Sequence, residues 1–220
     1  MTTVTPDETR KLALRLMDEN TSIRSAPLCP ELRLHLLRDD APVWHASDKH
    51  LFDDAGLRPY WAFCWGSGQA LARYVLDHPE LVRGRRVLDF GAGCGIAGIA
   101  AAQAGAGHVT ATEIDPLAVV AIESNARLND AAVEPLLEDV IQTGRSDWEV
   151  LLAADVCYWS SNAEWLGRLA AHEGLILIGD PGRPGLDKSN LQELARYRVR
   201  TVPEIERYSI KEAAVYRFRQ

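Results

Sequence analysis

Short apolar runs, each followed by a segment of helical length, recur over most of the chain. Their length and composition are typical of strands buried on both faces of a parallel sheet. They lie at Val87–Phe90, His108–Thr112, Val133–Leu137, Trp148–Ala154 and Leu175–Ile178. The helices predicted around them are Asp7–Asn20, Gly68–Leu76, Ile96–Ala104, Pro116–Leu128, Asn162–Ala171 and Leu186–Ala195. This alternation predicts an α/β fold with helices on both faces of the sheet.

The two ends of the chain depart from that alternation. Glu31–Leu37 has leucine at every second position, which predicts a half-buried strand. Near the C-terminus, Tyr197–Val202 and Ala213–Phe218 are strand-like with no full helix between them, so we expect the last strand to pair antiparallel. The expected organisation is an N-terminal extension over residues 1–60, packed on a single domain over 61–220 with a seven-stranded, Rossmann-like sheet.

A glycine-rich turn follows the first of the buried strands. The segment DFGAGCG has glycines at Gly91, Gly93 and Gly95, which permit a sharp turn and close approach of the backbone to a ligand. The next strand ends at Glu113, and an acid at that place binds ribose hydroxyls in nucleotide sites. A dinucleotide fingerprint needs a glycine at position 96, which is isoleucine here. The turn instead resembles the first motif of class I S-adenosylmethionine-dependent methyltransferases.

Composition narrows the classes of protein further. The 220 residues are 47% hydrophobic and 25% charged, as in an ordinary globular protein, and the net charge of −7 argues against a protein that clamps nucleic acid. The cysteines are scattered without metal-ligand spacing, so neither disulfides nor a metal site is expected. No apolar run is long enough for a membrane span, and the N-terminal helix is too acidic for an import signal. We therefore expect a cytoplasmic protein.

Acidic residues end or directly follow the predicted strands. They are Asp89, Glu113, Asp139, Asp155 and Asp180. Ligands bind at the carboxyl ends of the strands in such a sheet, so these side chains are expected at one rim. Asp89, Glu113 and Asp139 would contact the amino-acid part, the ribose and the adenine of the cofactor in turn. Asp139 could equally cap the next helix.

Asp155 and Tyr158 follow the fourth buried strand, where the transferred methyl group is expected. An acid there can orient an incoming amine, and an aromatic face attracts an alkylammonium group. In the structural alternative, Asp155 caps a helix beginning near Ser160 and Tyr158 is a packing residue.

Two further segments supply candidate binding residues. Trp65 is placed to cover the cofactor and Trp61 to contact the substrate, although tryptophans here could simply pack the N-terminal segment onto the domain. After the fifth strand, GDPGRP forms a rigid loop with Asp180 and Arg183. We interpret it as a substrate-positioning loop, with a tight strand-to-helix connection as the alternative.

These segments together resemble a family. Asp155 and Tyr158 match the [D/E]-x-x-[F/Y] motif of the seven-β-strand protein lysine methyltransferases. The segments PYWAFCWGSGQALARYVLDHP, VLDFGAGCGIAGIAAAQAGA, EIDPLAVVAI and IGDPGRP are similar to the electron transfer flavoprotein beta-subunit lysine methyltransferases. The resemblance extends from about Glu19 to the end of the chain. Import sequences begin the organelle members, so a bacterial cytoplasmic member is the simplest account.

The resemblance implies transfer of methyl groups from S-adenosylmethionine to lysines of a folded protein, the electron transfer flavoprotein beta subunit, with S-adenosylhomocysteine as product and without a metal. It implies Asp155 and Tyr158 as the catalytic pair and Trp65, Asp89, Gly91, Gly93 and Glu113 as cofactor contacts. A ribosomal protein remains an alternative substrate, and a small-molecule N-methyltransferase or a non-catalytic binding module remains an alternative function. A nucleic-acid methyltransferase is disfavoured because DVCY stands where [N/D]-P-P-[Y/F] would be expected.

Overall fold

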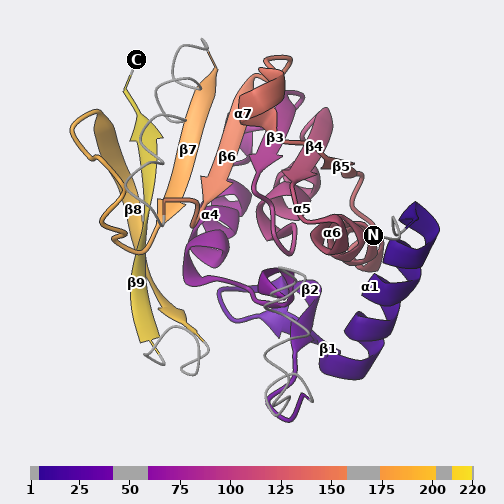
Figure 1. Ribbon diagram of the computed structural model, residues 1–220. Helices are drawn as coiled ribbons and strands as arrows, with labels where there is room; N and C mark the ends of the chain where they lie inside the picture. Colours follow the sequence, from indigo (N-terminus) through magenta and orange to yellow (C-terminus); the bar gives the residue numbers. More distant parts are fainter. Residues whose placement is uncertain (1–4, 42–58, 158–173, 202–209, 220) are drawn as a thin grey trace.

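A seven-stranded sheet in the order β5-β4-β3-β6-β7-β9-β8 forms the centre of the molecule (Figure 1). The computed structural model describes residues 5–41, 59–157, 174–201 and 210–219. The strands of this sheet are β3 (Arg86–Phe90), β4 (His108–Glu113), β5 (Glu134–Leu137), β6 (Val150–Ala154), β7 (Leu175–Asp180), β8 (Leu191–Arg200) and β9 (Ile210–Phe218). All pairs from β5 to β7 are parallel, so the carboxyl ends of these strands meet at one rim.

Helices cover the sheet because successive residues of each buried strand point to opposite faces. On one face, α4 (Gly66–Asp77) and α5 (Ile96–Gln103) pack on side chains that include Val87, Val109 and Leu152. Beside them, α6 (Pro116–Leu128) contacts β4 and β5. On the other face, α7 (Val140–Thr143) contributes Val140 to a cluster with Leu88 and Leu151. The predicted fold class is confirmed.

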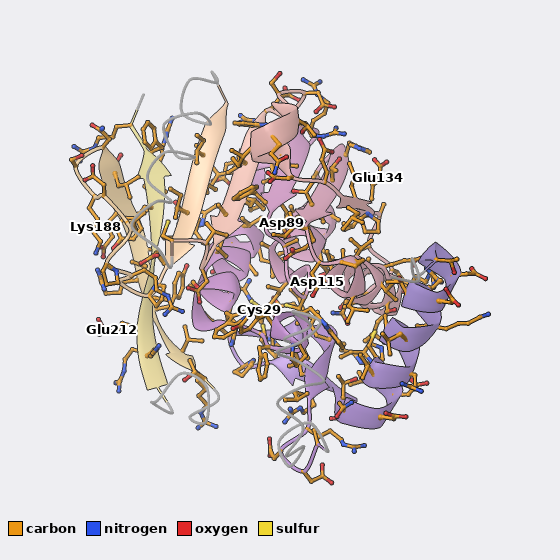
Figure 2. The ribbon with its side chains drawn as sticks, viewed as in Figure 1. Cys29, Asp89, Asp115, Glu134, Lys188 and Glu212 are labelled. Carbon is orange, nitrogen blue, oxygen red and sulfur yellow. The ribbon has the colours of Figure 1, made fainter. Side chains whose placement is uncertain are left out.

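The last strand of the chain lies between β7 and β8 and runs antiparallel to both, as expected. β8 and β9 form a long ribbon at one side of the sheet (Figure 1). Figure 2 shows Lys188 and Glu212 on that side, whereas Asp89 and Asp115 lie near the middle of the molecule.

The N-terminal segment packs against helices that cover one face of the sheet, chiefly α6. It contains α1 (Pro6–Asn20) and a hairpin of β1 (Thr21–Ala26) and β2 (Cys29–Leu37). α1 lies against α6, and Ala13 and Met17 share a buried cluster with Leu117 of that helix (Figure 1). The short helices η1 (Tyr60–Ala62) and η2 (Pro79–Leu81) precede and follow α4. The division of the chain at residue 60 stays a prediction.

One prediction about secondary structure is corrected, and one strand was not predicted. The helix expected at Leu186–Ala195 is absent, because Leu191–Arg200 forms β8 and pairs with β9 along its length. Sheet pairing that buries Leu191 and Val199 overrides the helix propensity of the Gln-Glu-Leu-Ala-Arg segment. β1 escaped prediction because only its first and last residues are buried, which leaves no period-two signal. The helix expected at Asn162–Ala171 lies outside the described residues.

Candidate active site

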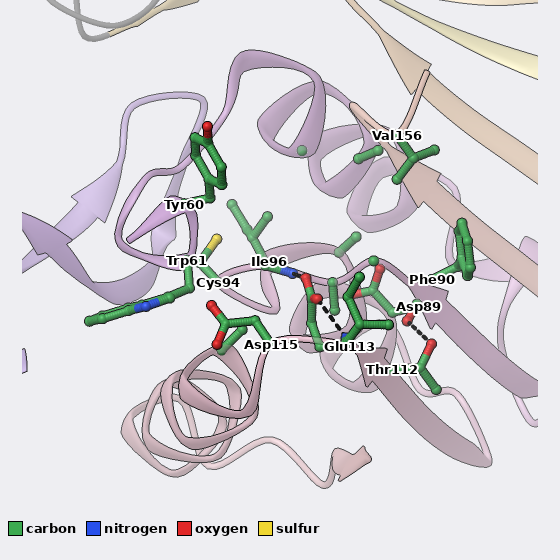
Figure 3. Close-up of a pocket in the computed structure, with 18 of the residues that line it drawn as sticks. Tyr60, Trp61, Asp89, Phe90, Cys94, Ile96, Thr112, Glu113, Asp115 and Val156 are labelled. Carbon is green, nitrogen blue, oxygen red and sulfur yellow. Dashed lines mark hydrogen bonds between the residues drawn. The ribbon is translucent and has the colours of Figure 1, made fainter. Parts of the chain in front are cut away.

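A cavity of about 470 Å³ opens at the carboxyl ends of β3, β4 and β6. Figure 3 shows its walls: Tyr60 and Trp61 come from η1, Asp89 and Phe90 from the end of β3, and Val156 follows β6. The tip of β4 and the segment after β5 complete the lining. This is the place at which an open α/β sheet binds its ligand.

The glycine turn forms the floor of this cavity. Gly91, Gly93 and Gly95 have φ angles of 62°, 55° and 78°, a left-handed conformation that other residues rarely adopt. The turn is held to the next strand, because the backbone N–H of Ala92 donates to the carbonyl of Thr112 at 3.1 Å. A Cβ added at Gly93 would have no heavy atom within 4 Å, so the backbone there is open to a ligand. Gly91 and Gly93 line the cavity, whereas Gly95 caps the start of α5.

Asp89 lies at the inner end of the cavity and is only 2% exposed. Its Oδ2 accepts a hydrogen bond of 2.7 Å from the backbone N–H of Gly98 in α5. Burial raises the pKa of Asp89 to about 7, and the nearby charge of Glu113 adds to that effect. Asp89 thus joins β3 to α5 and gives the cavity a carboxyl group whose charge is sensitive to its occupant.

Glu113 stands at the tip of β4, opposite the glycine turn. Its Oε1 accepts from the backbone N–H of Gly93 at 2.8 Å, and its Oε2 accepts from that of Ile114 at 3.0 Å (Figure 3). Burial raises the pKa of this carboxyl as well. Each oxygen retains acceptor capacity, so Glu113 can still receive a pair of hydroxyl donors such as those of ribose.

Two aspartates near the cavity cap helices. Asp139 begins α7, where its Oδ1 accepts from the backbone N–H groups of Ile141 and Gln142. Asp115 begins α6 and accepts from the N–H of Leu117 at 2.8 Å. Asp139 also lines the cavity, so the capping role expected as one alternative is present and contact with a cofactor stays a prediction.

Aromatic residues of η1 and the residue before α4 also line the cavity. Trp61 is 2% exposed, and its Nε1 is buried without a hydrogen-bond partner among the described residues. Trp65 lines the cavity more openly and donates its Nε1–H to the carbonyl of Tyr60 at 3.2 Å. Its ring lies 5.7 Å from that of Phe63, measured between centroids. Trp61 therefore takes part in packing, as its alternative interpretation expects, and also faces the cavity.

The buried Asp155 and Asp180 and the partly exposed Arg183 lie together beside the cavity. Arg183 donates from Nε to Oδ1 of Asp155 at 2.8 Å and from Nη2 to Oδ2 at 3.1 Å. The neighbours of Asp155, Ala154 and Val156, line the cavity. The structure thus brings these predicted residues together, and their roles toward a substrate stay predictions. Tyr158, the other predicted catalytic residue, lies outside the described residues.

Sequence reasoning missed several residues that line the cavity. They include Tyr60, Cys94, Ile114, Glu138 and Val156. Ile114 is 73% exposed, which is unusual for an isoleucine. Its position between two acids at a strand tip was the available signal, because an apolar side chain there has no core to enter. It offers a flat ligand an apolar contact.

Comparison with known proteins identifies relatives over most of the chain. The electron transfer flavoprotein beta subunit lysine methyltransferase of Xenopus laevis is 38% identical over 213 residues, covering 91% of this chain and 84% of the relative. The protein of the same name from Homo sapiens is 38% identical over 184 residues, covering 80% of this chain and 69% of the relative.

A second similarity covers less of the chain. The family model for ribosomal protein L11 methyltransferase (PrmA) matches residues 67–155. The enzyme of that name from Chromohalobacter salexigens is 43% identical over 97 residues, covering 43% of this chain and 32% of the relative. The match to the family model therefore omits the N-terminal hairpin and the strands β7 to β9.

Solved structures match in fold. Magnesium protoporphyrin IX methyltransferase from Synechocystis PCC 6803 with bound SAM has a TM-score of 0.55 at 18% identity, covering 70% of this chain and 80% of that one. A ribosomal protein L11 methylase from Lactobacillus delbrueckii subsp. bulgaricus has a TM-score of 0.51 at 20% identity, covering 70% and 79%. These structural matches confirm the methyltransferase fold. The sequence relatives, which align with nearly the whole chain, also identify the family. The chain belongs to the electron transfer flavoprotein beta subunit lysine methyltransferase family.

Proposed function

We propose that this protein is an S-adenosylmethionine-dependent protein-lysine N-methyltransferase acting on the electron transfer flavoprotein beta subunit. The observation that carries the proposal is the 38% identity that spans 91% of this chain and 84% of a relative bearing that name. The similarity to ribosomal protein L11 methyltransferases stops at residue 155 in the family model. The flavoprotein subunit is therefore the favoured substrate, and a ribosomal protein is the second candidate.

The residues of the cavity fit this cofactor. An open backbone at Gly93, a carboxylate with free acceptor capacity at Glu113 and the exposed side chain of Ile114 suit an amino-acid group, a ribose and an adenine. When bound, S-adenosylmethionine supplies a methyl group on a positively charged sulfur, and S-adenosylhomocysteine is the product.

We assign the cofactor contacts as the sequence predicts them. Asp89, Gly91 and Gly93 hold the amino-acid end, and Gly95 sets the turn that presents it. Trp65 covers the cofactor, Glu113 binds the ribose and Asp139 approaches the adenine. Support comes from the cavity, which all of these residues except Gly95 line.

The remaining residues act on the substrate amine. A lysine amine has a reference pKa of about 10.4, so it must lose its proton before its lone pair can form the new N–C bond. We assign to Asp155 the acceptor that orients the amine N–H and to Tyr158 the aromatic wall of that pocket. Trp61, Asp180 and Arg183 belong to the substrate side of the site.

The location of the protein in the cell is also part of the proposal. Within the described part of the chain, no helix is both long and apolar enough to cross a membrane. We keep the cytoplasm as the proposed compartment.

A methylation assay with defined substrates tests the function. The purified protein is incubated with labelled S-adenosylmethionine and, separately, with electron transfer flavoprotein beta subunit, ribosomal protein L11 and a cell extract from a strain lacking the enzyme. We expect lysine methylation of the flavoprotein subunit, located by mass spectrometry. Label in L11 alone would support the second candidate. Label confined to small molecules of the extract would contradict a protein substrate.

A further inference from the structure

Arg183 and Asp155 form a bidentate ion pair. The two hydrogen bonds, 2.8 Å and 3.1 Å, join the Nε and Nη2 groups of the guanidinium to the two carboxylate oxygens. The Asp155 side chain is only 3% exposed, against 29% for Arg183. Paired bonds of this kind define the plane of the carboxylate as well as its position.

The fold fixes the backbone of both partners. The N–H of Asp155 donates to the carbonyl of Gly179 in β7 at 3.0 Å. Oδ1 of Asp180 accepts from the N–H groups of Gly182 and Arg183 at 2.6 Å and 2.7 Å, which tightens the loop that carries the arginine. The ion pair therefore spans two strand ends that are already anchored, and it belongs to the framework of the site.

Asp155 also adopts an unusual backbone conformation. Its φ angle is +55°, and Asp130 is the only other non-glycine residue with positive φ in the described part of the chain. Such a conformation is unfavourable by about 1 kcal/mol or more and persists where surrounding structure enforces it. Ala154 and Val156 on either side line the cavity. The strained residue thus lies at the edge where the proposed transfer takes place.

Other ionisable groups also face this pair. Asp180, the last residue of β7, has an Oδ2 that is buried without a partner among the described residues, and burial raises its pKa. Cys157, after β6, is buried, which raises its pKa to about 12 and keeps it a neutral thiol. Asp89, on the neighbouring strand β3, directs its Oδ2 toward α5 instead. The main positive charge beside Asp155, in the part of the chain that the structure describes, is that of Arg183.

We propose that Arg183 is a positioning residue that orients the Asp155 carboxylate and cancels its charge, so that the substrate ammonium releases its proton to solvent on binding and the amine becomes neutral and nucleophilic. This inference rests on the proposed function and gives Arg183 a role through Asp155 instead of direct contact with the substrate. It assigns a mechanism for amine deprotonation that the glycine turn and its acids do not provide.

The physical argument concerns the charge that the amine meets. An isolated carboxylate stabilises an ammonium group beside it and so holds the proton that methyl transfer must remove. With Arg183 attached, the pair carries no net charge, while the remaining lone pairs of Asp155 still accept an amine N–H. The amine is then oriented without being kept protonated.

Substitutions at Arg183 separate charge from geometry. In Arg183→Gln the positive charge is lost, and we expect the acidic limb of the kcat pH profile to move upward by at least about one pH unit. Arg183→Lys keeps the positive charge but not the bidentate geometry. The acidic limb of its kcat pH profile should therefore lie within about half a pH unit of the wild-type limb, whereas kcat should fall about tenfold or more. Arg73→Gln is the matched control, because Arg73 forms a similar bidentate pair with Asp77 within α4. Arg73→Gln should leave both the acidic limb and the value of kcat unchanged.

A binding measurement gives a readout that does not depend on turnover. The flavoprotein subunit is titrated into enzyme saturated with S-adenosylhomocysteine, by calorimetry in two buffers of different ionisation enthalpy. The wild type should release close to one proton per binding event at pH 8, and Arg183→Gln clearly fewer. An equal proton release, or an unshifted pH limb in the Gln variant, overturns the proposal.

Thermal unfolding establishes whether each variant is folded. If Arg183→Gln does not fold, the Lys variant decides, because a wild-type kcat in that variant overturns the positioning role. Failure of the proposed function has a different signature, since the wild-type enzyme would then leave the flavoprotein subunit unmethylated.

Discussion

The carboxylate of Asp89 and the backbone N–H of Gly98 lie 2.7 Å apart, which joins the end of β3 to the first turn of α5. A Cβ added at Gly98 would lie 3.0 Å from the same Oδ2, so this contact depends on a glycine in the helix. The negative charge also faces the N-terminus of α5, where the helix dipole favours it. The Asp89 side chain therefore both stabilises the fold and lines the cofactor cavity.

The stability of the folded protein should depend on pH through Asp89. Burial raises its pKa from the ordinary value of 3.8 to about 7, so the folded state holds the proton more tightly than the unfolded chain. The contribution to stability is complete below about pH 4 and is lost as the pH rises through about 7. Asp89→Asn preserves the shape of the side chain and removes this dependence.

The difference in unfolding free energy between Asp89→Asn and wild type should shift in favour of the variant by about 2–4 kcal/mol from pH 4 to pH 8. Chemical denaturation across that range measures it. A difference between the two proteins that does not vary with pH contradicts the pKa assigned to Asp89.

Glu113→Gln should weaken the binding of S-adenosylmethionine by about 10- to 100-fold, because a neutral amide accepts hydroxyl hydrogen bonds less strongly than a carboxylate. Calorimetric titration measures the affinity. Glu134→Gln is the matched control, since Glu134 begins β5 at the other end of the neighbouring strand and pairs with His108. Equal affinities in the two variants would remove Glu113 from the cofactor site.

Asp155→Ala should reduce methyl transfer at least about 1000-fold while S-adenosylmethionine binds within about threefold of wild type. The substitution removes the acceptor that orients the amine, whereas the glycine turn and Glu113 remain intact. Transfer of labelled methyl groups and calorimetry together test this expectation. Full turnover by the variant would exclude the assigned role.

Gly179→Ala should destabilise the protein by at least about 2 kcal/mol. A Cβ at this position would lie 2.5 Å from the carbonyl oxygen of Ser67, so β7 and α4 would have to separate. Gly144→Ala provides the comparison, because Gly144 has a φ of +68° and no heavy atom near an added Cβ. Gly144→Ala should lower the free energy of unfolding by about 1 kcal/mol, because only the backbone conformation becomes unfavourable. Denaturant unfolding distinguishes the two effects.

Asn125→Ala should destabilise the protein by about 1–3 kcal/mol. The fully buried Asn125 amide donates to the carbonyl of Cys94 at 2.9 Å, and its oxygen accepts from the N–H of His35 at 2.8 Å. One side chain of α6 therefore joins the glycine turn to the N-terminal hairpin. Ser124→Ala, which removes only a bond within α6, should have a much smaller effect in the same unfolding measurement.

Features that depend on neighbours in sequence were predictable from the amino acids alone. The positive φ angles of Gly91, Gly93 and Gly95 are possible because glycine has no side chain. The bounds of α6, Pro116 to Leu128, are those predicted from an N-cap at Asp115 followed by proline. The parallel strands were predictable because most are short apolar runs with an acid at or just beyond the carboxyl end. These patterns also place Asp89 and Glu113 at one rim, since parallel strands align their carboxyl ends.

Features that join distant segments were decided only by the tertiary structure. The Leu191–Arg200 segment is a strand because β9 pairs with it, although its local propensity favours a helix. Asp155 and Arg183 are separated by 28 positions, and their pairing depends on how β6 and β7 align and on the loop that Asp180 tightens. A local pattern determines what a segment can form, whereas packing and charge pairing between segments determine which of those possibilities has the lowest free energy.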